Sequence, residues 1–234
     1  MLRLHEITSG YGSTQVLHGI SYEVPAGEVA VLLGRNGVGK TTLLQTIMGQ
    51  LPLRQGTLTL GEQDIGRLPT HERARLGLAY VPQGREIFPG LSVLQNLRVA
   101  VLGTKRREWR QRLDRILADF PLLADKLNDS GRSLSGGQQQ VLAIARALIT
   151  EPRVLLLDEP SEGIQPSIVV EIAELLVSVA GERGIAVLVA EQNLDFVAHV
   201  TPSVNVIDKG RLVAQVPVEE LLNTAELQHK YLGV

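Results

Sequence analysis

The chain has 234 residues and a formal charge of −2, from 23 basic and 25 acidic side chains. Hydrophobic residues make up 44% of it and aromatic residues only 3%, so we expect one large domain with a substantial core. The absence of a basic excess and the scarcity of aromatic rings argue against nucleic acid as a partner. Cysteine is absent, which excludes disulfides, thiolate metal sites and cysteine nucleophiles.

The apolar runs of the sequence are short. The longest lie at residues 29–33, 154–157 and 185–190, whereas a membrane-spanning helix needs roughly 20 apolar residues. Residues 1–6 lack the apolar stretch of a secretory signal, so export is not expected. We therefore expect a protein that neither spans a membrane nor leaves the cell.

The first 50 residues alternate short apolar segments with turns. Residues 2–7 and 17–24 are predicted strands of a β-rich edge, and a Pro-Ala-Gly turn then leads into a buried strand at 29–33. From Lys40 the apolar residues recur at helical spacing until Gly49. Strand, glycine-rich loop and helix form the first predicted unit.

Residues 86–150 have a different character, with many charges and apolar residues at helical spacing. We interpret them as a mostly helical subdomain, inserted between two parts of an α/β core at residues 1–85 and 151–234. The whole chain is then a single domain with one insertion.

The second part of the core repeats the strand–helix alternation. A strand is predicted at 154–158, a helix around 168–180, a second strand at 185–190 and a hairpin that turns at 208–210. Strands that are separated by helices favour a mostly parallel sheet, covered on both faces.

A phosphate-binding pattern occupies the first glycine-rich loop. Residues 34–41 read GRNGVGKT and match G-x-x-x-x-G-K-[ST] between a predicted strand and a predicted helix, which disfavours the alternative of an ordinary glycine-rich turn. The glycines allow the backbone to bend around phosphate, and the new helix directs free N–H groups at the anion. Lys40 would reach the β- and γ-phosphates, and the Thr41 hydroxyl would bind Mg²⁺. The expected nucleotide-binding residues of this loop are Gly34, Arg35, Asn36, Gly37, Val38, Gly39, Lys40, Thr41 and Thr42.

Two acidic residues, Asp158 and Glu159, stand at the end of the buried strand predicted at 154–158. Asp158 ends the strand at the carboxyl edge of the sheet, where ligands of open α/β sheets bind and where Mg²⁺ would find an oxygen ligand. Glu159 is a natural general base for an attacking water. On its own, Asp-Glu-Pro after a strand is equally a capping turn, but together with the phosphate loop it predicts a catalytic site.

Between these two motifs stands the sequence LSGGQ, formed by Leu134, Ser135, Gly136, Gly137 and Gln138. Here the chain resembles the nucleotide-binding subunits of ATP-binding-cassette (ABC) transporters. The resemblance implies an α/β P-loop NTPase with a mostly parallel central sheet, an N-terminal antiparallel β edge and an inserted helical subdomain. It also implies that these five residues bind the ATP of a partner subunit, in a head-to-tail dimer. The alternative is that Ser135 only caps a helix.

The family pattern assigns two further residues. Tyr11 stands where an aromatic ring stacks on adenine, and Gln83 matches a glutamine that contacts Mg²⁺ or the attacking water. The resemblance thus implies ATP and Mg²⁺ as cofactors, with Thr41, Gln83 and Asp158 as metal ligands. Glu159, Gln83 and Gln192 are its expected catalytic residues, and the activity is ATP hydrolysis.

Two positions depart from the common family pattern. Gln192 stands where most members have a histidine that contacts the γ-phosphate, and Gln165 stands where an aspartate is common. Glutamine can donate a hydrogen bond to phosphate but cannot become cationic, so it stabilises charge more weakly. The turnover rate of this site is therefore left open, although Glu159 argues that it is active.

The sequences around these two departures, at residues 162–166 and 191–193, resemble those of the smaller ATPase subunit of branched-chain amino acid importers and related importers. The loops at residues 34–39, 82–89 and 135–140 most resemble the urea or short-chain-amide subunit of that group, and branched-chain amino acids are the alternative solute. The resemblance implies partners: a second ABC ATPase subunit, two transmembrane permease subunits and a periplasmic or surface solute-binding protein. It places the chain in the cytoplasm, peripheral on the inner face of the membrane.

Other patterns leave alternatives open. Residues 83–97 would contact the permease, or form an ordinary connector. The basic cluster at 105–112, around Trp109, is typical of a solvated helix face rather than a lipid-binding one, and the five histidines lack metal-ligand spacing. Two other classes compete with a transport ATPase: a soluble non-transport ABC ATPase, and a P-loop kinase or phosphotransferase, in which LSGGQ would have no purpose.

Overall fold

The computed structural model describes residues 1–103 and 105–233. Thr104, in the predicted helical subdomain, and Val234, at the end of the predicted core, lie outside the described residues. The strands are β1 Leu2–Tyr11, β2 Thr14–Val24, β3 Val29–Leu33, β4 Gln55–Leu60, β5 Gln63–Asp64, β6 Leu78–Val81, β7 Val154–Asp158, β8 Ala186–Glu191, β9 Ser203–Asp208 and β10 Arg211–Pro217. The helices are α1 Lys40–Met48, α2 Thr70–Arg75, α3 Val93–Ala100, α4 Arg106–Asp119, α5 Pro121–Ala124, the short 3-10 helix η1 Gly131–Ser133, α6 Gly136–Leu148, α7 Pro166–Arg183, α8 Leu194–Val200, α9 Val218–Asn223 and α10 Ala225–Tyr231.

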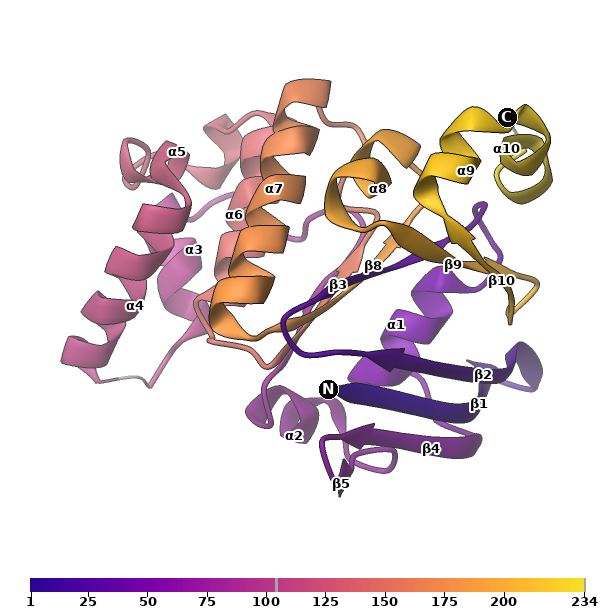
Figure 1. The fold of residues 1–234 in the computed structure, drawn as a ribbon. Helices are drawn as coiled ribbons and strands as arrows, with labels where there is room; N and C mark the ends of the chain where they lie inside the picture. The colour runs from indigo at the N-terminus through magenta and orange to yellow at the C-terminus, as the bar shows by residue number, and fades with distance from the viewer. Residues whose placement is uncertain (104, 234) are drawn as a thin grey trace.

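The strands form two sheets (Figure 1). The first has the order β2-β1-β4-β5 and is antiparallel, which confirms the predicted N-terminal β edge. The second has the order β10-β9-β3-β8-β7-β6, and β9, β3, β8, β7 and β6 run parallel in it. Only the hairpin strand β10 is antiparallel to its neighbour. The prediction of a mostly parallel central sheet is therefore confirmed.

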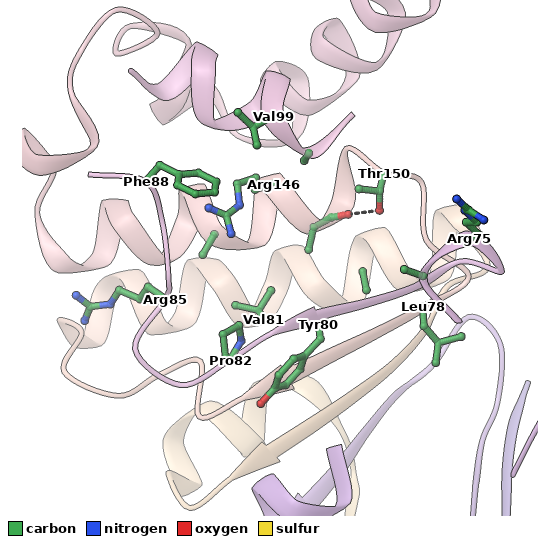
Figure 2. A pocket seen from close by; sticks show the side chains of 15 residues that line it. Arg75, Leu78, Tyr80, Val81, Pro82, Arg85, Phe88, Val99, Arg146 and Thr150 are labelled. Carbon is green, nitrogen blue, oxygen red and sulfur yellow. Dashed lines mark hydrogen bonds between the residues drawn. The ribbon is translucent and has the colours of Figure 1, made fainter. Parts of the chain in front are cut away.

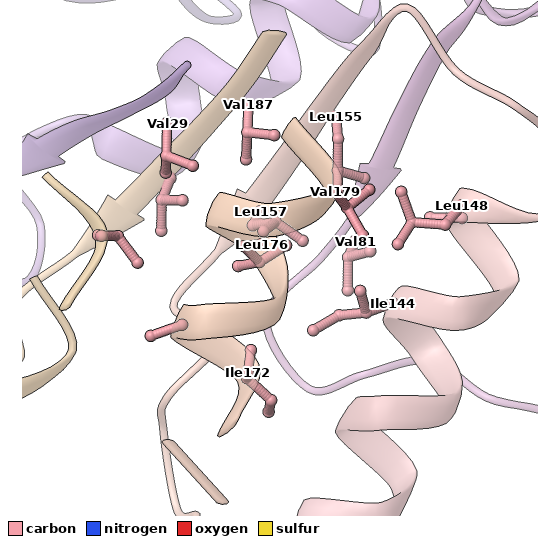
Figure 3. Packing of buried hydrophobic residues seen from close by; sticks show 14 of the residues in the cluster. Val29, Val81, Ile144, Leu148, Leu155, Leu157, Ile172, Leu176, Val179 and Val187 are labelled. Carbon is pink, nitrogen blue, oxygen red and sulfur yellow. The ribbon is translucent and has the colours of Figure 1, made fainter. Parts of the chain in front are cut away.

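The central strands are covered on both faces. Every residue of β7 and β8 is buried, and successive side chains of β7 alternate between two cores. Leu155 and Leu157 pack in the cluster that includes α6 and α7, whereas Val154 and Leu156 pack in the cluster that includes α1 and the antiparallel sheet. Figure 3 shows the first of these clusters, with strand residues facing Leu176 of α7 and Ile144 of α6. Burial on both sides explains the unbroken apolar runs of these strands.

The helices α3 to α6 lie together on the opposite side of α7 from the antiparallel sheet (Figure 1). Several elements differ from the predictions made from the sequence. The first hairpin is longer than predicted, because β1 continues to Tyr11 and β2 begins at Thr14. No prediction covered the C-terminal helices α9 and α10, or the elements β4, β5, α2 and β6 between residues 55 and 81. Among the described residues, no helix combines the length and the apolar character needed to cross a membrane.

Candidate functional site

The candidate site lies at one edge of the parallel sheet. Strands β3, β6, β7 and β8 run in the same direction, so the loops that follow them emerge from the same edge. These loops begin at Gly34 after β3 and at Pro82 after β6, and the turns at Glu159 and Gln192 follow β7 and β8. The sheet topology thus brings together motifs that are far apart in the sequence, as expected for an open α/β sheet.

The glycine-rich loop curls between β3 and the start of α1. Gly39 has a φ of 113° at the N-terminus of α1, a conformation that glycine adopts without strain. Gly34 has no space for a side chain, since a Cβ there would lie 2.5 Å from the carbonyl oxygen of Ile207. The first turn of α1 carries no acidic residue, and its free N–H groups form a site suited to an anion.

The ammonium group of Lys40 lies inside this loop. Lys40 Nζ donates to the carbonyl oxygens of Gly34 at 2.7 Å and Arg35 at 3.1 Å. It also lies 3.0 Å from Glu159 Oε1, and both side chains of this ion pair are buried. The ion pair joins the phosphate loop to the turn after β7, so the two predicted functional groups contact each other directly.

Glu159 adopts a backbone conformation that is unusual for its residue type. Its φ is 47°, a region that costs non-glycine residues energy and that is frequent at functional sites. Its amide donates to the carbonyl oxygen of Ala190 at 2.9 Å, and its Oε2 accepts from Gln83 Nε2 at 3.3 Å. Gln83 Nε2 also donates to Glu162 Oε2 at 3.0 Å. The tertiary contacts therefore hold the Glu159 carboxylate between Lys40 and Gln83.

Asp158 lies beside this group and is 1% exposed. Its Oδ1 accepts from Thr41 Oγ1 at 3.2 Å and its Oδ2 accepts from Tyr80 Oη at 3.1 Å. Burial raises the pKa of Asp158 above its ordinary value, and the two hydrogen bonds and the charge of Lys40 partly oppose that rise. Burial also raises the pKa of Tyr80, and the charge of Asp158 raises it further. Tyr80 therefore remains a neutral hydrogen-bond donor to this carboxylate.

The donor set around Asp158 fits a magnesium ion. The Thr41 hydroxyl and an Asp158 carboxylate oxygen are hard oxygen ligands, and they lie within hydrogen-bond distance of each other. Mg²⁺ prefers one or two carboxylates together with substrate phosphates. Among the described residues, no group of three or more His, Asp or Glu side chains is arranged to hold a metal by itself. The arrangement suits an ion that arrives with a phosphate ligand.

A cavity of about 500 Å³ opens over these groups. It falls in the range typical of small-molecule sites. Tyr11 lies at its rim, 49% exposed, and the Tyr11 hydroxyl donates to Gln45 Oε1 at 3.1 Å. The cavity is lined by Tyr11, Val16, Asn36, Gly37, Gly39, Lys40, Thr41, Thr42, Gln83 and Glu159.

Several predicted residues lie beside this cavity without lining it. Gly34 and Arg35 contribute carbonyl oxygens to Lys40, and the Arg35 guanidinium turns away to the carbonyl oxygen of His229 at 2.6 Å. The carbonyl oxygen of Val38 accepts from the amide of Gly210 at 2.8 Å. Gln192 is exposed and lines a separate depression with Asn193, Leu194, Asp195 and Leu232.

The LSGGQ residues, Leu134 to Gln138, are not among the residues that line the cavity. Ser135 caps α6: its Oγ accepts from the Gln138 amide, and the Gln138 side chain accepts from the Ser135 amide at 3.0 Å. The capping role considered from the sequence is therefore present. Within one chain, the structure does not bring LSGGQ and the phosphate loop into one cavity.

Sequence patterns missed two polar residues of this region. Tyr80 is half-buried on β6, a strand that was not predicted, and a tyrosine hydroxyl removed from solvent usually has a hydrogen-bond partner. Glu191 ends β8 and is 1% exposed. A carboxylate at the end of an apolar strand was the available signal, and it is the same signal that identified Asp158.

Three comparisons with known proteins bear on this geometry. The sequence profile described as "ABC transporter" matches residues 17–162. The chain is 35% identical to the high-affinity branched-chain amino acid transport ATP-binding protein BraG of Pseudomonas aeruginosa, over all of both proteins. It is 34% identical to the lipopolysaccharide export system ATP-binding protein LptB of Escherichia coli, over 99% of this chain and 97% of that protein. A crystal structure of a nucleotide-free ATP-binding cassette from an ABC transporter superposes with a TM-score of 0.86, at 25% identity, over 97% of this chain and 96% of that one. This likeness confirms the predicted fold class.

Proposed function

The chain belongs to the ABC transporter family of ATP-hydrolysing subunits, and on that basis we propose that it powers a solute importer with the site described above. The observation that carries this proposal is that Lys40 and Thr41 line one cavity together with Glu159, and that Asp158 is hydrogen-bonded to Thr41 beside it. The first two residues come from the phosphate loop and the other two from the end of β7. A phosphate-binding loop, a metal-binding carboxylate and a general base are what metal-assisted hydrolysis of a nucleotide requires.

The ion pair between Lys40 and Glu159 suggests an order of events when ATP binds. In this proposal ATP phosphates replace Glu159 as the partner of Lys40, and the freed carboxylate accepts the proton of the attacking water. Gln83, which already contacts Glu159, orients that carboxylate. Mg²⁺, held by Thr41, Gln83 and Asp158, would neutralise phosphate charge. Tyr11 at the cavity rim would stack on the adenine.

The position of LSGGQ supports a dimeric site. Ser135 is exposed at the N-terminus of α6, and none of the LSGGQ residues lines the cavity of its own chain. In our proposal they contact the ATP of a second ABC ATPase subunit, which in turn completes the site around Lys40. The exposed Gln192 would then approach the γ-phosphate when the two subunits close.

A second cavity, of about 480 Å³, is a suitable contact for a permease subunit. Figure 2 shows it between β6 and the helices α3 and α6, with Phe88 and Arg146 on one side and Val81 and Pro82 on the other. The Arg146 guanidinium lies 5.0 Å from the centre of the Phe88 ring. Because Gln83 follows directly after Pro82, a helix docked here would transmit motion to the catalytic site. The chain would then work on the inner face of the membrane, with two permease subunits and a solute-binding protein.

ATP binding and dimerisation test the site. The purified full chain should bind Mg-ATP in calorimetry, gain a dimeric species with ATP in light scattering, and hydrolyse ATP slowly when alone. A chain that fails to bind Mg-ATP contradicts the proposal. A chain that binds ATP and transfers its phosphate to a small molecule, rather than to water, would indicate a phosphotransferase.

The solute needs a separate test, because it contacts other subunits. The motif resemblance favours urea or short-chain amides, whereas the likeness to BraG favours branched-chain amino acids. Uptake of labelled urea, acetamide and leucine should be compared in cells with the gene intact, deleted and complemented. Loss of urea and acetamide uptake alone supports the first solute, and loss of leucine uptake alone supports the second. Unchanged uptake of all three would contradict the importer and direct attention to export, the process named for LptB.

A further inference from the structure

Glu191 is a buried carboxylate to which the mechanism above assigns no role. It is the last residue of β8 and is 1% exposed. Its position at the carboxyl edge places it between the loop after β7 and the turn after β8. An ionised carboxylate is costly to bury unless its oxygen atoms accept hydrogen bonds, so its contacts are informative.

The two carboxylate oxygens hold two different loops. Glu191 Oε1 accepts from the amide of Ser161 at 3.0 Å and from the Ser161 hydroxyl at 2.5 Å. Glu191 Oε2 accepts from the amide of Gln192 at 2.7 Å and from the amide of Asn193 at 3.0 Å. One oxygen therefore binds the segment that follows Glu159, and the other binds the segment that contains Gln192.

Neighbouring contacts close this arrangement. Asn193 Nδ2 donates to Ser161 Oγ at 3.2 Å, so the two loops also contact each other directly. The Asn193 side chain caps α8 by accepting from the Asp195 amide at 3.0 Å. Ser161 is 7% exposed. The polar cluster of Ser161, Glu191 and Asn193 is thus largely enclosed and internally bonded.

The backbone of Glu191 reaches the phosphate loop. Its carbonyl oxygen accepts from the amide of Gly34, the first residue of the loop, at 3.2 Å, and Leu33 is its partner in the sheet. The preceding residue, Ala190, accepts from the amide of Glu159 at 2.9 Å. Two consecutive residues of β8 therefore connect three of the segments that carry the proposed functional groups: the phosphate loop, the turn with Glu159 and the turn with Gln192.

We propose that Glu191 is a positioning residue for ATP hydrolysis, holding the Gln192 backbone in register with the loop that carries Glu159. The inference rests on the proposed function, because the proposed function assigns Gln192 and Glu159 to the same reacting phosphate. Charge-assisted hydrogen bonds are stronger and shorter than neutral ones, so a carboxylate fixes both loops better than an amide does. Glu191 does not line the cavity itself, and it acts only through its neighbours.

The substitution Glu191→Gln tests the contacts with little change in shape. One side-chain oxygen becomes an NH₂ group, which faces backbone N–H donors and cannot accept from them. Hydrogen exchange of the full chain without nucleotide should become faster in peptides covering residues 159–163 and 191–195. Exchange at the wild-type rate in both segments would overturn the proposal, whether or not the chain hydrolyses ATP.

Single-turnover kinetics distinguish a loss of positioning from a loss of stability. We expect Glu191→Gln to lower single-turnover kcat about tenfold or more, because misplacement by about 1 Å can cost roughly 10²-fold. The Kd for ATP should stay near the wild-type value, since Lys40 and its loop are intact. Val200→Ala, which shortens a buried side chain of the adjacent helix α8, is the control for lost stability. It should lower the melting temperature with kcat unchanged.

A double-mutant cycle identifies the group through which Glu191 acts. In a Gln192→Ala background, Glu191→Gln should lose most of its effect on kcat, because the residue that it positions is gone. The same loss in both backgrounds would overturn a role through Gln192. If the Glu191→Gln variant does not fold, Ser161→Ala takes its place in the same cycle. This substitution removes the hydroxyl that donates to Glu191 Oε1.

The outcomes also distinguish this inference from the proposed function. A wild-type chain that does not bind Mg-ATP contradicts the proposed function, whereas the exchange result still reports on the contacts of Glu191. A wild-type chain that binds and hydrolyses ATP, together with a Glu191→Gln variant of unchanged kcat, contradicts only the positioning role.

Discussion

Lys40 Nζ and Glu159 Oε1 lie 3.0 Å apart in an ion pair whose side chains are only 3% and 7% exposed. The cation that would bind phosphate and the carboxylate that would activate water therefore neutralise each other in the structure described here. Because both are buried, neither can lose its partner without a replacement. A nucleotide phosphate can replace Glu159 as the partner of Lys40. Mutations of Lys40 and of Glu159 should therefore have different effects on ATP binding and on hydrolysis.

Lys40→Ala should weaken ATP binding and destabilise the fold. The variant leaves the buried Glu159 carboxylate without its cation, and removal of one partner of a buried pair typically costs about 3–5 kcal/mol. Calorimetry with Mg-ATP and thermal unfolding measure the two effects. Lys126→Ala is the control, because Lys126 forms a more exposed ion pair, in which its Nζ lies 3.7 Å from Asp129 Oδ2. Near-equal destabilisation by the two variants would contradict the importance of the buried pair.

Glu159→Gln should retain ATP binding and slow hydrolysis. Glutamine can still accept from Lys40, but it cannot take a proton from water, and loss of a general base typically costs about 10²–10⁴ in rate. The expected result is a Kd near that of the wild type, a low kcat and a dimer that persists with ATP. Glu174→Gln, at an exposed position of α7, should behave as the wild type. A loss of ATP binding as large as that of Lys40→Ala would contradict the assignment.

Tyr80→Phe should raise the Mg²⁺ concentration needed for hydrolysis. The Tyr80 hydroxyl donates to Asp158 Oδ2, and without it the carboxylate is less firmly oriented towards Thr41. Tyr22→Phe is a matched control, since the Tyr22 hydroxyl accepts from Asn205 Nδ2 at 3.1 Å, away from the site. Each variant should lose about 1 kcal/mol of stability with its hydrogen bond. If the Mg²⁺ dependence is the same in both variants, Tyr80 does not orient Asp158.

Ser135→Ala should impair ATP-dependent dimerisation beyond its effect on stability. Ser135 and Gln138 form a capping box on α6, and Ser92 and Gln95 form the same box on α3. Loss of either cap should cost about 1 kcal/mol, so Ser92→Ala controls for capping alone. Light scattering with ATP measures the dimer. Equal dimerisation by the two variants would mean that Ser135 only caps its helix.

Asp158→Asn should change how stability depends on pH. Burial raises the pKa of Asp158 above the ordinary value of 3.8, so over the interval between that value and the raised pKa the folded state binds more protons than the unfolded state. Stability from this group is therefore full below pH 3.8 and is lost as pH rises through the folded-state pKa. The stability of Asp158→Asn relative to wild type should be highest at neutral pH and fall on acidification. Denaturant unfolding at several pH values measures it, and a constant difference would contradict the shift.

The sequence alone predicted those parts of the fold and site that depend on neighbouring residues. The glycine-rich loop, the start of α1 and the acidic pair after β7 are each contiguous, so their spacing indicates their chemistry. The apolar strands β3, β7 and β8 were predictable for the same reason, because burial on both faces excludes polar residues from a continuous run. The helices α9 and α10 were missed because they are short and their apolar spacing is weak.

Residues 34–41 and 158–159 thus predicted by themselves a phosphate-binding loop with a lysine and a hydroxyl, and two carboxylates near it, at the edge of a parallel sheet. Only the tertiary structure decided that Lys40 contacts Glu159, that Tyr80 holds Asp158 and that Glu191 joins the loops of Ser161 and Gln192. The physical reason is that these contacts join segments at the ends of strands that are adjacent in the sheet, or separated by a single strand, but remote in the chain. Their partners are set by strand order, which local spacing does not contain.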